Sequence, residues 1–230
     1  MGIINGMTRA ASALAYWERR QEIVTNNLAN ADTNGFRAQR TFARAIGDAL
    51  PVADTALDTR NGALKSTGNP LDIALGGEGY FVVNTAGGER FTRGGALRLD
   101  ASSRLVDQNG NAILGEAGPI VLPPGAVSVD ASGGVTVDGK LVDRLRVETV
   151  PAGTEMPHEG GTFLVPGQGR TPLAAESRSV QQGFLEDSNV NTVGSMVDMI
   201  SIQRSYAAVQ RTMTTLDGIR QTISNELGKV

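Results

Sequence analysis

Apolar residues recur every three or four positions at both ends of the chain, and this spacing predicts two long helices. The first runs from residue 3 to about 29, where apolar positions alternate spacings of four and three. That 3.5-residue period is typical of a helix packing along another helix. The turn signal at 32–35 is expected to end it near Asn30. The members of this stripe are Ile3, Met7, Ala10, Leu14, Trp17, Gln21, Val24 and Leu28, of which only Gln21 is polar.

The second predicted helix runs from about 189 to 227. Asp187, Ser188 and Asn189 are the candidate N-caps, because short polar side chains accept hydrogen bonds from the first turn. Its apolar stripe consists of Met196, Met199, Ile202, Tyr206, Val209, Met213, Leu216, Ile219, Ile223 and Leu227.

Between the helices, apolar runs shorten and turn signals become frequent, which predicts β structure from about 70 to 175. Residues 80–83 and 89–93 are expected to form a hairpin, with further turns at 109–110 and 138–139. The pattern predicts roughly eight to ten short strands in a sandwich or small barrel. Residues 68–70 are expected to turn into the first strand, and residues 92–95 to close a hairpin with Arg93 as an exposed or interface charge.

The predicted fold class is therefore mixed α and β, with long N- and C-terminal amphipathic helices flanking an all-β middle domain. Residues 1–35 and 186–230 form a terminal helical assembly region, 36–69 a connecting arm or linker, and 70–185 a β-rich domain. Within the arm, 36–50 is read as a short helix or an extended segment, and 51–68 as a linker or loop.

Two arrangements of the helices stay open. They can pack on each other within one molecule, or pack with helices of neighbouring subunits. Burying a single stripe does not offset the backbone entropy of ordering a helix, so we expect the ends to be partly disordered in the free monomer and to order on assembly. A head-to-tail contact that does not close generates a helical filament.

Composition excludes several function classes. The net charge of −3 offers no basic excess for nucleic acid, and no stretch approaches the roughly 18 apolar residues of a membrane span. The N-terminus does not read as a cleaved signal peptide. Without cysteine, and with His158 alone in a loop-like stretch, the sequence predicts no metal site, cofactor or catalytic residue, and the chain is not expected to be an enzyme.

Four motifs, in order along the chain, resemble those of flagellar rod and hook proteins. They are NNLANADTNGFR at 26–37, TGNPLDIAL at 67–75 followed by GEGYFVV at 77–83 and FTRGG at 91–95, LEDSNV at 185–190, and MISIQRSY at 199–206. The short length favours a rod protein over a hook protein. GEAGPI at 115–120 is similar to the proximal-rod type, which we favour over the distal-rod type, although 188–191 and 199–206 fit both.

The resemblance implies a structural subunit of the bacterial flagellar basal-body rod, exported by the flagellar type III apparatus without a cleaved signal peptide. In the periplasm it would polymerise through its terminal helices into the hollow drive shaft that transmits torque to the hook. Its partners would be other rod subunits or copies of itself, the export apparatus, and peptidoglycan or the surrounding ring. Nucleic acid and a membrane span are not expected.

The predicted assembly interface combines the two stripes with the N-terminal motif. The asparagines are expected to bond backbone groups and partner chains, or only to cap and end the helix. Gly35 is expected in a left-handed turn. The full set is Ile3, Met7, Leu14, Trp17, Val24, Asn26, Asn27, Leu28, Asn30, Gly35, Met196, Met199, Gln203, Tyr206, Val209, Met213, Leu216, Ile223 and Leu227.

Two other classes of protein make different demands on the sequence. An enzyme acting on peptidoglycan would need a catalytic pair, and none is recognisable in the sequence. A monomeric binding module or export chaperone predicts a stable monomer that never polymerises.

Overall fold

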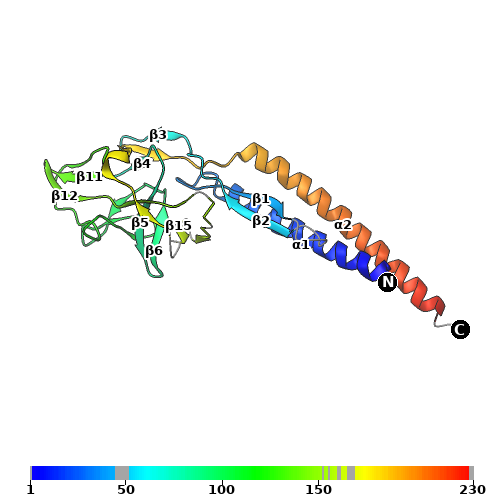
Figure 1. Ribbon diagram of the computed structural model, residues 1–230. Coiled ribbons are helices and arrows are strands. Elements are labelled where there is room, and N and C mark those ends of the chain that lie inside the picture. The colour runs from blue at the N-terminus through cyan, green and yellow to red at the C-terminus, as the bar shows by residue number, and fades with distance from the viewer. Residues whose placement is uncertain are drawn as a thin grey trace. The chain divides into compact units, whose positions relative to one another are not determined.

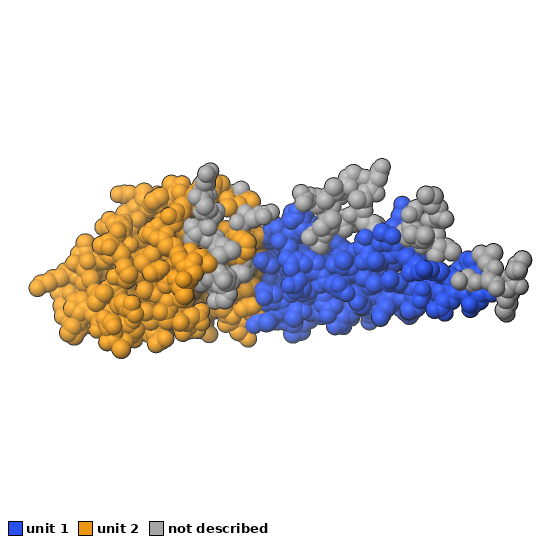
Figure 2. Space-filling view, turned by 90° about the horizontal axis from the view of Figure 1, so that it is seen from below, with its two compact units in different colours: residues 1–29, 39–56, 190–230 blue, residues 30–38, 57–189 orange. Residues whose placement is uncertain are grey.

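The computed structural model describes residues 2–44, 52–151, 153, 154, 156–159, 162–164 and 169–227. The chain forms two compact units (Figure 2). The helical unit comprises residues 1–29, 39–56 and 190–230, and the β unit comprises 30–38 and 57–189. Two terminal helices thus flank an all-β middle region, which confirms the predicted fold class.

The helical unit contains α1 (Gly2–Ala29) and α2 (Thr192–Leu227), which lie side by side (Figure 1). The helices are antiparallel, because Glu18 pairs with Tyr206 whereas Gly6, earlier in α1, faces Leu216, later in α2. The two terminal helices therefore pack on each other within one molecule, which is the first of the two arrangements left open by the sequence. A two-stranded sheet of β1 (Gln39–Arg44) and β2 (Val52–Leu57) accompanies the helices, and β1 contacts α1.

Residues 36–68, predicted to be an arm and a loop, are more regular than expected. Residues 39–44 are a strand, so the extended reading of that stretch is confirmed and the helical one is wrong there; residues 45–51 lie outside the described part of the chain. The loop reading of 51–68 is wrong where β2 and β3 (Leu64–Ser66) lie, because β2 pairs with β1 and β3 pairs with β18 (Phe184–Glu186).

The ends of the helices follow the sequence closely, with one correction. α1 ends at Ala29, and Gly35 adopts a φ of 71°, as expected. The side chain that caps α2 is Asn191, whose Oδ1 accepts the Gly194 amide at 2.8 Å. The predicted Asn189 does not cap, because its side chain is bound instead to backbone groups of Ala38 and Asp58 within the β unit.

The β unit is built from short strands around one large sheet. In addition to β3, its strands are β4 (Ile73–Leu75), β5 (Tyr80–Thr85), β6 (Gly88–Thr92), β7 (Arg98–Leu99), β8 (Leu105–Val106), β9 (Ala112–Ile113), β10 (Val127–Val129), β11 (Gly134–Val137), β12 (Lys140–Arg144), β13 (Val147–Thr149), β14 (His158–Glu159), β15 (Thr162–Leu164), β16 (Thr171–Pro172), β17 (Val180–Gln182) and β18 (Phe184–Glu186). A 3-10 turn, η1 (Ala175–Ser177), precedes β17.

The large sheet has the order β14-β15-β6-β5-β9-β8-β7, and β13 joins it by pairing with β5 and β16. β10, β11 and β12 form a separate three-stranded sheet, while β17 pairs with β4 and β18 with β3. The predicted hairpin of β5 and β6 and the turns at 109–110 and 138–139 are confirmed. The described strands β4 to β16 number thirteen, more than expected, because several contain only two residues.

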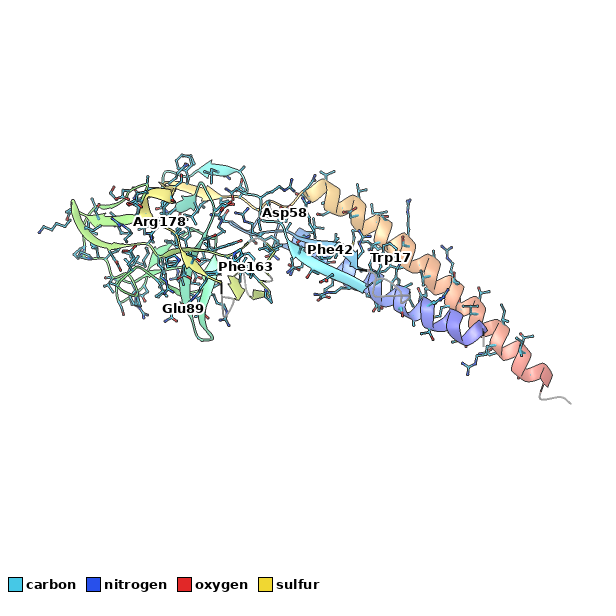
Figure 3. All side chains as sticks on the ribbon, in the orientation of Figure 1. Trp17, Phe42, Asp58, Glu89, Phe163 and Arg178 are labelled. Atoms are coloured by element: carbon cyan, nitrogen blue, oxygen red, sulfur yellow. The ribbon has the colours of Figure 1, made fainter. Side chains whose placement is uncertain are left out.

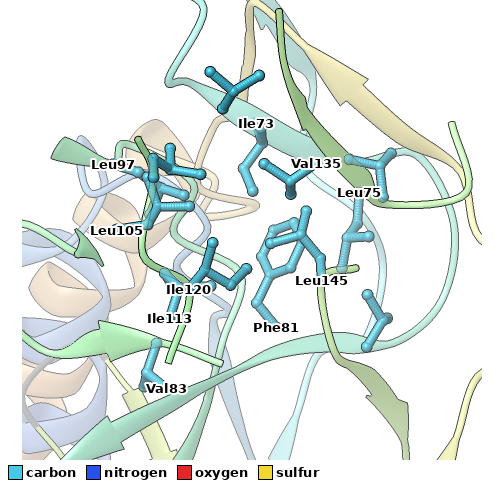
Figure 4. Close-up of a cluster of buried hydrophobic side chains, with 14 residues drawn as sticks. Ile73, Leu75, Phe81, Val83, Leu97, Leu105, Ile113, Ile120, Val135 and Leu145 are labelled. Atoms are coloured by element: carbon cyan, nitrogen blue, oxygen red, sulfur yellow. The ribbon is translucent and has the colours of Figure 1, made fainter. Parts of the chain in front are cut away.

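The continuous apolar run in β5 is explained by two cores, one on each face. Phe81 and Val83 belong to the larger core (Figure 4), and Tyr80 and Val82 to a smaller one with Phe163. Alternate residues of a strand face opposite sides, so a strand buried on both sides is apolar at every position. The larger core comprises Ile73, Leu75, Phe81, Val83, Leu97, Leu105, Ile113, Ile120, Leu122, Val135, Val137, Leu145, Val147 and Val180.

Three loops of the β unit share one geometry. Each begins with an aspartate, Asp100, Asp107 or Asp130, whose Oδ1 accepts the amides two and four residues later at 2.8–2.9 Å. The fourth residue of each loop has positive φ, and it is glycine in two loops but Ser103, with φ 58°, in the other. A left-handed conformation costs a residue with a Cβ roughly 1–2 kcal/mol, whereas glycine adopts it freely.

We therefore expect Ser103→Gly to raise the free energy of unfolding by about 0.5–1 kcal/mol, as measured by denaturant titration. The matched control is Ser102→Gly in the same loop, where φ is not positive. There the added chain entropy of glycine is expected to lower stability by about the same amount. Equal effects of the two substitutions would contradict the strain at Ser103.

Candidate assembly surface

The predicted stripe of α1 lies on the covered side of that helix. Ala10 and Val24 are buried, and Met7, Leu14 and Trp17 are partly buried. Gln21 and Leu28 are also partly buried, so every member whose side chain is described is at least partly covered. The side chain of Ile3 lies outside the described residues.

The covered face of α1 is wider than the predicted stripe. Ile23 and Asn27 are buried as well, with 3% and 7% of their surface exposed. The guanidinium of Arg20 lies 5.3 Å from the Trp17 ring, a cation–π contact on the same helix (Figure 3 labels Trp17). α1 therefore packs against two elements, the helix α2 and the strand β1.

The predicted stripe of α2 is covered only in its middle. Ile202 is buried, and Met199, Tyr206, Val209, Met213 and Leu216 are partly buried. The Tyr206 hydroxyl donates to Glu18 of α1 at 3.1 Å, and this bond raises the pKa of Tyr206. Met196 and Ile223, by contrast, remain 50% and 42% exposed; Gln203 is also exposed, and the side chain of Leu227 is not described.

A row of large apolar side chains lies exposed on the first turns of α2. Val193, Met196, Val197 and Ile200 are spaced at i, i+3, i+4 and i+7, so they share one face of the helix, and they are 73%, 50%, 61% and 52% exposed. We call these four residues the α2 row. Three of its members lie outside the predicted interface, although their spacing was visible in the sequence.

Among the motif asparagines, Asn27 has a clear role. Its amide nitrogen donates to the carbonyl oxygen of Gln39 at 2.8 Å, and its Oδ1 accepts the Gln39 amide at 2.9 Å. The side chain thus replaces a strand partner for β1 and holds the β1–β2 sheet against α1. Asn26 is exposed. Just after the helix, the backbone carbonyl oxygen of Asn30 accepts the Thr33 amide at 3.1 Å, and its Oδ1 accepts the Thr33 hydroxyl at 3.3 Å.

We expect Asn27→Ala to lower the stability of the β1–β2 sheet by about 1–3 kcal/mol, because two backbone groups of Gln39 lose their partner. Amide hydrogen exchange at Gln39 should accelerate accordingly. Asn26→Ala on the exposed neighbouring position is the control and should leave this rate unchanged. Unaltered exchange in Asn27→Ala would show that the paired hydrogen bonds do not hold β1 against α1.

Gly35, in contrast, belongs to the interior of the β unit. A Cβ on this residue would lie 2.3 Å from the carbonyl carbon of Arg93. Arg93 itself is 2% exposed, so the expectation that it is an exposed or interface charge is wrong. Its side chain binds Glu186 and Asn61, partners far away in sequence that no local pattern reveals.

The remaining expectations concern ligands and membranes. The described residues contain no group of three or more His, Asp or Glu side chains placed to hold a metal ion. His158 lies in β14 rather than in a loop, and its side chain is not described. Within the described part of the chain, neither helix combines the length and apolar character needed to cross a membrane.

Three family models match the chain in order. "Flagella basal body rod protein" matches residues 7–37, "Flagellar hook protein FlgE/F/G D1 domain" matches 74–137, and "Flagellar basal body rod FlgEFG protein C-terminal" matches 181–226. The first covers most of α1 and the third covers nearly all of α2, so the models coincide with the helices and the β unit.

Curated relatives match over nearly their whole length. The chain is 31% identical to flagellar basal-body rod protein FlgF of Mesorhizobium japonicum, covering 94% of the chain and 97% of the relative. It is 31% identical to FlgF of Escherichia coli K12, covering 90% and 92%. Flagellar basal-body rod protein FlgG of Bacillus subtilis is 26% identical, covering 97% and 99%.

Proposed function

Because the chain belongs to the flagellar basal-body rod protein family, we propose that its helical unit polymerises with neighbouring rod subunits into the hollow drive shaft that transmits torque to the hook. The interface of this assembly is formed by the predicted stripes together with the α2 row. The protein acts in the periplasm after export by the flagellar type III apparatus without a cleaved signal peptide. Peptidoglycan or the surrounding ring contacts the outside of the shaft.

The observation that carries this proposal is the α2 row. Four large apolar side chains, each at least half exposed, lie on one helical face. A contiguous exposed apolar row of this kind is typical of a helix that packs against another protein. Burying each side chain from its half-exposed state contributes about 1 kcal/mol, repeated for every subunit of the polymer.

Both ends of α2 carry exposed apolar residues that helices of adjacent subunits can cover. α1 has 28 residues and α2 has 36, and Gly6 of α1 faces Leu216, so α2 extends for at least one turn past the start of α1. Ile223 lies in this extension and is 42% exposed, and Ile219, opposite the first residues of α1, is 46% exposed. Helices of adjacent subunits complete the burial that α1 leaves unfinished at both ends of α2.

The proposal also places the protein in the proximal part of the rod. The resemblance at 115–120 supports this position, and so does the higher identity to FlgF relatives, 31%, than to the FlgG relative, 26%.

Deletion of the gene, followed by electron microscopy of isolated basal bodies, tests the function. We expect loss of motility and basal bodies that end within the rod, with both defects reversed by the wild-type gene on a plasmid. The position at which the rod ends distinguishes a proximal from a distal subunit. Intact, rotating flagella in the deletion strain would overturn the proposal and reopen the binding-module and enzyme readings.

A further inference from the structure

Three segments of the β unit meet around the side chain of Asn189, and each lies at or next to a point where the chain passes between the two units. The segments are 36–38, 58–60 and 187–189. Asn189 Oδ1 accepts the Ala38 amide at 2.7 Å. Asn189 Nδ2 donates to the carbonyl oxygens of Asp58 and Arg60, at 2.9 and 2.8 Å. We call the three segments together the joint.

The two ends of the Asn189 amide have opposite roles. Its oxygen faces a donor, and its nitrogen faces two acceptors, so both hydrogens of the nitrogen are used. A backbone N–H only donates and a carbonyl oxygen only accepts, which fixes the orientation of the amide. Aspartate has nearly the same shape but, when ionised, offers acceptors alone. The site therefore selects an amide rather than a carboxylate.

Backbone hydrogen bonds close the joint around this side chain. The Asp58 amide donates to the carbonyl oxygen of Ala38 at 2.8 Å, and the Asn189 amide donates to that of Phe36 at 3.3 Å. Phe36 and Asp58 are buried, with 5% and 7% of their surface exposed. Backbone groups in such a place depend on protein partners, because water reaches them poorly. The side chain of Asn189 satisfies three of these groups at once.

We propose that Asn189 is a clasp that couples the three segments of the joint, so that they open and close as one unit. Ala38 and Asn189 are 151 positions apart in the chain, so the joint closes only when the C-terminal end of the β unit docks on segments from its N-terminal end. Loss of the clasp loosens the whole joint, including hydrogen bonds that the side chain does not itself make. The clasp acts within the β unit and does not depend on the proposed polymerisation.

Amide hydrogen exchange in full-length Asn189→Ala tests the coupling. The Ala38 amide loses its acceptor directly, so its exchange accelerates whether or not the segments are coupled. The informative amide is that of Asp58, which keeps its own acceptor on Ala38. We expect its exchange to accelerate at least tenfold, because opening of the joint no longer breaks the clasp. The amide of Gly110, in an exposed loop outside the joint, is the reference and should not change.

Acceleration at Ala38 with an unchanged rate at Asp58 would overturn the clasp, because the side chain would then serve its own bonds and not the joint. Equal acceleration at Gly110 would overturn it as well, since the effect would not be confined to the joint.

A second variant, Asn189→Asp, tests the opposite roles of the two ends. At pH 7 it directs a carboxylate oxygen at the carbonyl oxygens of Asp58 and Arg60, and we expect the thermal midpoint, measured by circular dichroism, to fall by about 5 °C. These surroundings disfavour the charged form and raise the pKa of the new carboxyl in the folded protein. The loss relative to wild type should therefore shrink as the pH falls from 7 to about 4.5, because the protonated carboxyl can donate to one carbonyl oxygen.

The charged side chains of the joint are present in both proteins, so comparison with wild type at each pH removes their own titration. Arg37 pairs with Glu186, and Arg60 pairs with Asp58. Asp187 is the remaining charged residue of the three segments.

The matched control is Asn191→Asp, the same substitution two residues later. Asn191 is exposed, and its oxygen caps α2 by accepting the Gly194 amide, a bond that a carboxylate makes equally well. The start of a helix stabilises negative charge, so the pKa of this new carboxyl is lowered in the folded protein. This variant should be at least as stable as wild type at pH 7, and any gain should be lost as the pH falls below about 4.

The clasp thus predicts pH profiles of opposite sign for the two aspartate variants. Profiles of the same sign would overturn it, and so would a midpoint for Asn189→Asp equal to that of wild type at pH 7. If Asn189→Asp does not fold at pH 7, recovery of folded protein at pH 4.5 is the expected result. Failure at both pH values, where Asn191→Asp folds, would overturn the clasp.

Discussion

Replacing Ile200 by aspartate is expected to abolish motility and rod assembly while leaving the purified monomer folded. Ile200 is the last residue of the α2 row and is 52% exposed, so the monomer tolerates a charge there. In the polymer the same carboxylate would be buried without a partner, at a cost of several kcal/mol for every subunit. Motility in soft agar and electron microscopy of basal bodies measure assembly, and circular dichroism measures folding.

The matched control is Gln210→Asp, an exposed position on α2 beyond the α2 row. It changes helix propensity by a similar small amount and should preserve motility. Aspartate at Leu14 or Met213 would be a less specific test, because both residues are partly buried in the helical unit and a charge there would disturb the helix pair as well. A motile Ile200→Asp strain would remove the α2 row from the interface.

Gly35→Ala is expected to lower the free energy of unfolding of the β unit by about 2–4 kcal/mol. Two effects combine at this residue. A φ of 71° is strained for alanine, and the new Cβ would lie 2.3 Å from the Arg93 carbonyl carbon, a backbone atom that cannot rotate away. Denaturant titration measures the loss of stability, and amide hydrogen exchange in β5 and β6 shows whether it occurs in the β unit.

Gly68→Ala separates the two effects. Gly68 also has a φ of 71°, but nothing lies within 4 Å of a Cβ placed there. This control should cost only about 1 kcal/mol, the strain of a left-handed alanine. Equal losses at the two glycines would show that the approach of Arg93 does not constrain Gly35. A larger loss at Gly35 than at Gly68 would show that Gly35, which lies in the motif at 26–37, is needed for the fold of the β unit independently of any role in assembly.

Regular periodicity made the helices and the middle strands predictable. The 3.5-residue spacing indicates that one face of a helix is covered. The continuous apolar run in β5 indicates a strand that is buried on both sides. The same spacing does not report how much of that face one partner helix covers. For this reason the sequence alone could not show that α1 covers the middle of α2 and leaves both of its ends exposed.

Features that depend on distant partners could not be predicted. Arg93 reads as a surface charge until Glu186 is brought beside it, and Asn189 reads as a helix cap until the backbone near Ala38 and Asp58 occupies its side chain. β1 and β2 were missed for a related reason. A two-stranded sheet is marginal alone, and its support comes from Asn27 of α1, which the sequence marked only as a residue near a helix end.

The most direct test of the proposed assembly uses the absence of cysteine from the chain. A single cysteine in place of Val197, which is 61% exposed, is treated with a maleimide reagent in the purified monomer and in isolated basal bodies. We expect rapid labelling of the monomer, strong protection in the basal body, and restored labelling after the basal body is dissociated. Equal labelling of monomer and basal body would contradict burial of the α2 row between rod subunits.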